Sequence, residues 1–184
     1  IRQPKVAKGK TLSRGGFTSP RVREGTYNVI IKKGRDIFEN KIELVYDSIT
    51  GLSKIEREKK HAITMKLYDM TQELAYLVYE LDLIISKLPQ KSKVLKSLQE
   101  LKETLVITKG DNYVGSVESQ LREKMADLYS KVSESWDVPS KSELNNYEVI
   151  KKRFEKAKKT FEKLKSKVDI KDILIDSYEK FLSK

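Results

Sequence analysis

The sequence contains no cysteine and a single histidine, His61. Disulfide bonds, thiolate metal sites and a cysteine nucleophile are therefore excluded. The residue four positions after His61 is Met65, so the paired-ligand spacing of a metal-binding helix is missing on that side. We expect His61 to lie at the surface or to face the hairpin, without a catalytic role. The sequence predicts neither a metal nor a cofactor.

Long apolar runs are also missing, and none approaches the roughly 18 residues that indicate a membrane-spanning helix. Apolar residues make up 38% of the 184 residues and charged residues 35%, which is typical of long helices with solvated outer faces. The length suits one domain with an appendage. The chain begins with Ile1 and not with methionine, so we expect an upstream portion to have been removed.

Acidic residues are scarce at both ends of the chain. Residues 1–25 hold seven basic residues and one acidic residue, and residues 141–184 hold thirteen basic and eight acidic residues. The residues between them sum to zero, so the two ends carry the whole net charge of +11. Such a balance is typical of proteins that bind nucleic acid, anionic surfaces or acidic partners.

The first part of the chain predicts extended structure. Residues 1–25 combine glycine, proline and basic residues without periodicity, which indicates a basic arm or edge strands. Residues 26–48 alternate apolar and polar positions around Lys33-Gly34, which predicts a β-hairpin. Because two strands alone are marginally stable, we expect the apolar face to dock on the arm, the helices or another domain. That face consists of Tyr27, Val29, Ile31, Phe38, Ile42 and Leu44.

Residues 53–184 carry apolar seams at helical spacing. Capping boxes at Ser53-x-x-Glu56 and Ser140-x-x-Glu143 mark the starts of the two long helices. A change of phase after Asp169 indicates a short fifth helix or a kink. With short connections, the predicted fold is mainly α, an antiparallel bundle of four main helices with an N-terminal β-hairpin or small β-unit. Its interior should include Leu74, Leu121, Tyr129, Phe154 and Phe161.

No residue pattern indicates catalysis. The carboxylates are interleaved with lysines on helix surfaces, and no pair is set apart as an acid and a base. The basic run between Lys151 and Lys167 is interrupted by glutamates at seven-residue intervals and lacks aromatic residues on its polar face. A solvated face explains this run better than a nucleic-acid track.

One set of short motifs resembles a known protein tail. Ser19-Pro20-Arg21-Val22 and Gly25-Thr26-Tyr27-Asn28-Val29 precede the hairpin, and Leu121-Arg122-Glu123-Lys124 with Tyr129 follows the long helix. This order is similar to the C-terminal region of bacterial sortilin-like, BNR-repeat β-propeller proteins, often labelled glycosyl hydrolases. Glu24 replaces the proline of that family's strand motif. The resemblance implies an accessory module of a secreted, periplasmic or envelope protein. Any hydrolase activity would then belong to the propeller, and no catalytic residue can be transferred to this chain.

Three hypotheses follow. The first is a non-catalytic structural or protein-interaction module, which packs against an upstream propeller domain or another subunit. The second is a basic helical module that binds nucleic acid or an anionic surface, and it predicts binding that weakens steeply with salt. The third is a hydrolase site completed by an upstream propeller, which requires a carboxylate of perturbed pKa facing a cleft.

Overall fold

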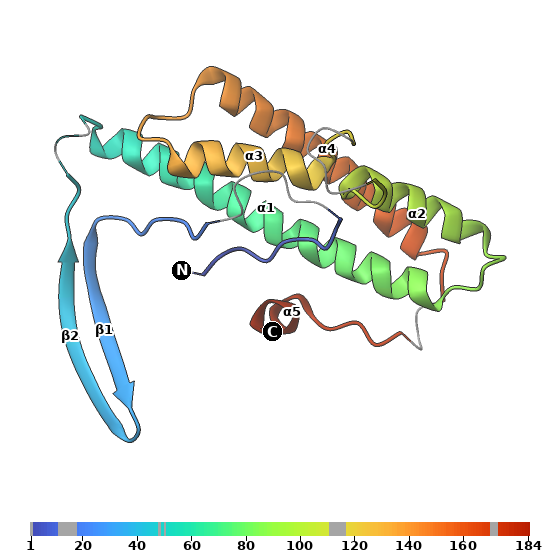
Figure 1. The fold of residues 1–184 in the computed structure, drawn as a ribbon, viewed down its shortest axis with the longest axis horizontal. Helices are drawn as coiled ribbons and strands as arrows, with labels where there is room; N and C mark the ends of the chain where they lie inside the picture. Colours follow the sequence, from blue (N-terminus) through green and yellow to red (C-terminus); the bar gives the residue numbers. More distant parts are fainter. Residues whose placement is uncertain (1, 11–17, 48, 50, 111–116, 170–172) are drawn as a thin grey trace.

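The computed structural model describes residues 2–10, 18–47, 49, 51–110, 117–169 and 173–184. It confirms the predicted fold class, since the protein is mainly helical, with an N-terminal antiparallel hairpin and four main helices in contact (Figure 1). The elements in chain order are β1 (Gly25–Lys33), β2 (Asp36–Leu44), α1 (Lys54–Lys87), α2 (Lys93–Leu105), α3 (Leu121–Glu134), α4 (Lys141–Lys165) and α5 (Tyr178–Ser183).

Both long helices begin at the predicted capping boxes. The backbone N–H of Ser53 donates to the Glu56 carboxylate at 2.8 Å, and Ser140 donates to Glu143 in the same way at 2.7 Å. Each serine hydroxyl accepts the reciprocal backbone N–H. These bonds satisfy N–H groups that have no partner within the helix. At its other end, α1 stops before Pro89, because the residue ahead of a proline is driven into extended geometry.

The 34-residue α1 is the centre of the bundle and packs against each of the other helices. Helices α2 and α3 also pack against α4, and all these helices share one core. Every bundle residue predicted to be interior is less than 3% exposed: Leu74, Leu121, Tyr129, Phe154 and Phe161. The apolar seams therefore act as predicted, as the interior of a helical bundle.

The basic arm runs beside the bundle without forming a strand in its described parts, residues 2–10 and 18–24. Its Ala7 is buried in the core cluster, and the Lys10 N–H donates to the Ile107 carbonyl at 2.9 Å. Farther along, the buried Tyr129 hydroxyl donates to the Thr18 carbonyl at 2.7 Å. The arm is therefore fixed to the bundle on both sides of residues 11–17.

The C-terminal segment forms a separate short helix and does not continue α4. Its Phe181 packs against Tyr76 and Tyr79 of α1, with ring centroids 5.5 and 5.1 Å apart. The Tyr79 hydroxyl donates to the Asp176 carboxylate at 3.2 Å, just before α5 begins. This cluster attaches the end of the chain to the C-terminal half of α1.

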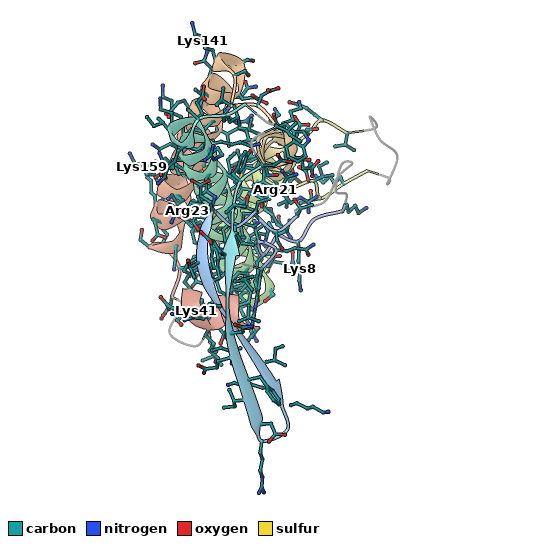
Figure 2. All side chains as sticks on the ribbon, turned by 90° about the vertical axis from the view of Figure 1, so that its left-hand side faces the viewer. Lys8, Arg21, Arg23, Lys41, Lys141 and Lys159 are labelled. Carbon is teal, nitrogen blue, oxygen red and sulfur yellow. The ribbon has the colours of Figure 1, made fainter. Side chains whose placement is uncertain are left out.

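Strands β1 and β2 form a long hairpin that extends away from the bundle in both views (Figures 1 and 2). Gly34 has a φ of 62°, and no other described residue except a glycine has a positive φ. With Lys33 and Asp36 paired across a two-residue loop, this is the pattern of a type II′ turn, which matches the twist of the strands. The turn therefore spans Gly34 and Arg35.

Candidate interaction site

The register of the hairpin places the predicted apolar residues on one face. Tyr27 lies opposite Ile42, and Ile31 lies opposite Phe38. Successive residues of a strand alternate between the two faces, so Val29 and Leu44 share this side. We call this surface, formed by Tyr27, Val29, Ile31, Phe38, Ile42 and Leu44, the apolar hairpin face.

Three of the six residues of the apolar hairpin face are exposed to solvent, and the other three are half-buried. Phe38 and Ile31 near the tip are 57% and 60% exposed, and Ile42 is 43% exposed. Tyr27, Val29 and Leu44 are half-buried. Within the described residues, no helix packs against either strand. The sequence suggested that this face docks on the arm, the helices or another domain. The helices leave it uncovered. An exposed apolar row on an isolated hairpin is typical of an interaction surface.

Charged residues lie on the opposite face of β2 and have no ion pair within the described part of the chain. Glu39 and Lys41 face Ile30 and Asn28 of β1, respectively. Among the residues that the structure describes, none forms a strand on the outer edge of β2. The backbone N–H of Lys41 donates to the side-chain carbonyl of the neighbouring Asn40 at 2.8 Å.

A basic cleft opens where the hairpin meets the start of α1. Arg57 lies there, paired with Glu24 at 2.7 Å and stacked on the Tyr46 ring at 4.3 Å. His61 lines the same cleft and faces the hairpin base, as one of its two predicted placements requires. Burial and the nearby Arg23 lower the pKa of His61, so its neutral form is favoured. Figure 2 shows Arg23 at the hairpin base.

The buried carboxylates of the bundle are paired with cations. The buried Glu80 forms an ion pair with Lys165 at 2.7 Å. Glu73 is half-exposed and forms a similar ion pair with Lys158 at 3.0 Å. These two contacts join α1 to α4 and use part of the basic run that suggested nucleic-acid binding.

The described residues contain no group of three or more histidine, aspartate or glutamate side chains placed to hold a metal. None of their helices has the length and apolar character needed to cross a membrane.

Sequence reasoning missed a buried ion pair that fixes the arm. Arg122 and Glu123 are each 2% exposed, and the Arg122 Nε donates to the Glu123 carboxylate at 2.6 Å. A second guanidinium nitrogen donates to the Ala7 carbonyl at 3.0 Å. A Cβ at Gly9 would lie 2.2 Å from the same nitrogen, so only glycine fits there without movement of this group. Adjacent arginine and glutamate residues usually indicate a helix surface, so no local pattern predicted this burial.

Comparison with protein-family models gives no match, and comparisons with curated proteins and with solved structures give none either. The resemblance to sortilin-like tails therefore stays a prediction. The apolar hairpin face and the basic cleft are the two candidate interaction sites of the protein.

Proposed function

We propose that this chain is a non-catalytic structural and protein-interaction module, and that its hairpin joins it to another subunit. The apolar hairpin face carries this proposal. A two-stranded sheet is marginal alone, whereas three or more strands with an apolar face are independently stable. The hairpin extends from the bundle, and no strand among the described residues pairs with the outer edge of β2. Another strand on that edge would supply what the hairpin lacks.

The partner that fits this edge is a second copy of the same strand. In a hairpin with a two-residue turn, the residues that hydrogen-bond to the neighbouring strand alternate with residues whose backbone points outward. Counted from the Lys33–Asp36 pair at the turn, four residues of β2 point their backbone groups outward: Ile37, Glu39, Lys41 and Glu43. An antiparallel copy can pair only through these positions. The symmetry is that of a two-fold dimer, in which both subunits use the same surface.

Charge and strand overlap together favour one register for this pairing. With the two-fold axis at Asn40, all nine residues of both strands overlap, and each Glu39 lies opposite Lys41 of the other copy. The same register sets Phe38 beside Ile42 of the other copy, so the two apolar faces become continuous. A shift of the axis to Glu39 or to Lys41 would place like charges directly opposite, which destabilises a sheet. An axis at Ile42 would also pair opposite charges, Lys41 with Glu43, but it would overlap only residues 40–44 of each strand. The register centred on Asn40 therefore combines opposite charges with the full overlap.

Charge exchange across this pair tests the proposal. Wild-type protein should dimerise in sedimentation velocity experiments over a range of concentrations. Glu39→Lys and Lys41→Glu should each weaken the dimer, because every dimer contains two such pairs. At about 0.2–1 kcal/mol per pair, with repulsion of similar size, the loss is about 1–4 kcal/mol, or roughly fivefold or more in Kd.

Rescue distinguishes this strand pairing from general surface charge. A mixture of the two single variants should form a heterodimer, and the double exchange E39K/K41E should restore the homodimer. Lys32→Glu, on the opposite strand, is the matched control and should leave the dimer intact. A wild-type protein that remains monomeric at every concentration would remove the second copy as the partner. An upstream propeller domain, as the resemblance implies for a secreted or envelope protein, would then be the partner to test.

A further inference from the structure

The junction between the hairpin and the bundle contains a cleft of about 490 Å³. One wall comes from residues 21–27 and Tyr46, and the other comes from the first turns of α1 together with Ser133 of α3. Small-molecule sites have volumes of roughly 300–1,000 Å³. The cleft is therefore large enough for a ligand bigger than a single ion.

Positive charge on the walls of this cleft exceeds negative charge. The carboxylates are those of Glu24 and Glu58, and Glu24 is already paired with Arg57. The ion pairs within the described residues include none of the remaining cations of the cleft. Four cations therefore face one free carboxylate: Arg21, Arg23, Lys54 and Lys60.

Neutral groups contact three of these four residues. The Arg21 guanidinium lies 4.6 Å above the Trp136 ring, and Lys60 donates to the Ser135 carbonyl. The Tyr27 hydroxyl donates to the Arg23 carbonyl at 2.7 Å and ties this arginine to the hairpin. The first two contacts hold charged groups without neutralising them, and the third holds the backbone of Arg23.

The cluster disfavours additional positive charge. Burial and the nearby Arg21 lower the pKa of Lys60, although Asp137 and Glu143 act in the opposite direction. Burial together with Arg23 lowers the pKa of His61. Cations that are gathered in a hollow with low-dielectric walls focus a positive potential on it. An anion bound there would relieve the repulsion and gain charge-assisted hydrogen bonds.

We propose that this cleft binds a small molecule through a phosphate monoester or diphosphate group. The guanidinium groups of Arg21 and Arg23 supply forked donors that match phosphate oxygens, and Lys60 supplies a further cation. The ring of Tyr27 forms an apolar wall for the rest of the ligand. The site lies beside the hairpin and needs no strand pairing, so it stands independently of the proposed dimer.

Inorganic pyrophosphate is the probe, titrated into the full chain at low salt by isothermal titration calorimetry. Arg23→Ala should weaken binding at least tenfold, while Arg23→Lys should retain part of it by preserving the charge. Lys159→Ala is the matched control, because it removes an exposed cation of α4 outside the cleft and should change binding less than twofold. Circular dichroism melts of the variants check that each one folds.

Two results would overturn the site. A flat titration would remove it, and equal losses from Arg23→Ala and Lys159→Ala would show that the positive charge acts diffusely. Vesicles of phosphatidylcholine and phosphatidic acid in equal amounts distinguish a lipid headgroup from a soluble ligand. Arg23-dependent binding to pyrophosphate without vesicle binding supports a soluble phosphate ester. Binding to vesicles alone would overturn the small-molecule proposal.

Discussion

Replacing Arg122 with alanine should destabilise the bundle by about 3–5 kcal/mol, because it leaves a buried carboxylate without its counter-ion. The side chains of Arg122 and Glu123 are each only 2% exposed, so water cannot replace the lost partner. The hydrogen bond to the Ala7 carbonyl is lost as well. Lys131 and Asp127, on the same helix, form a matched exposed pair whose side chains are 60% and 61% exposed. Lys131→Ala should cost no more than about 0.2–1 kcal/mol.

Urea unfolding followed by helical circular dichroism measures both values. With a slope of about 2 kcal/mol per molar urea, Arg122→Ala should lower the midpoint by about 1.5–2.5 M, while Lys131→Ala should scarcely move it. The double variant R122M/E123Q removes both charges and keeps an amide for the cap at Gln120, so it should recover much of the loss. Similar shifts for R122A and K131A would refute the argument that this pair is desolvated.

Three further outcomes are expected. Phe154→Ala should cost about 3–5 kcal/mol in the same assay, whereas Phe38→Ser should leave bundle stability within about 0.5 kcal/mol. Gly9→Ala should destabilise by about 1–3 kcal/mol and increase protease cleavage in the arm, because the new methyl group displaces a buried guanidinium. Burial raises the pKa of Tyr129 and of Tyr178 to about 12, so phenolate absorbance should show a late step that Tyr129→Phe reduces. The folded pKa of each tyrosine lies above its ordinary value of about 10, so folding favours the neutral phenol. This contribution to the free energy of unfolding is complete below pH 10 and is lost as the pH rises towards 12.

The fold could be predicted because its determinants are local. The spacing of apolar residues indicated each main helix, and the serine and glutamate of each capping box lie three residues apart, so one turn of sequence contains the signal. The apolar hairpin face was predicted in the same way, since Tyr27 and Ile42 follow a period of two. Periodicity shows which residues share a face but not whether another element packs against that face. The exposure of Phe38 could therefore not be predicted.

The features that sequence reasoning missed depend on distant contacts. Arg122 reaches the Ala7 carbonyl across 115 positions of sequence, and nothing in the motif around it distinguishes a buried arginine from a solvated one. The basic cleft similarly combines residues 21–27 with the start of α1 and with Ser133. Charge by itself suggested a basic arm, and only the fold places Arg23 opposite Lys60 in one hollow.

The hairpin leaves the bundle and returns to it at adjacent points, since Gly25 and Leu44 are cross-strand partners. Residues can therefore be added to or removed from both strands at the tip without changing the spacing of the helices. A two-residue turn needs a hydrogen-bonded pair before it, and such pairs recur at every second position. Length should thus change by two residues per strand, in steps of about 7 Å at 3.4 Å per residue. The distance between the hairpin tip and the bundle can thus vary while the helical bundle stays the same.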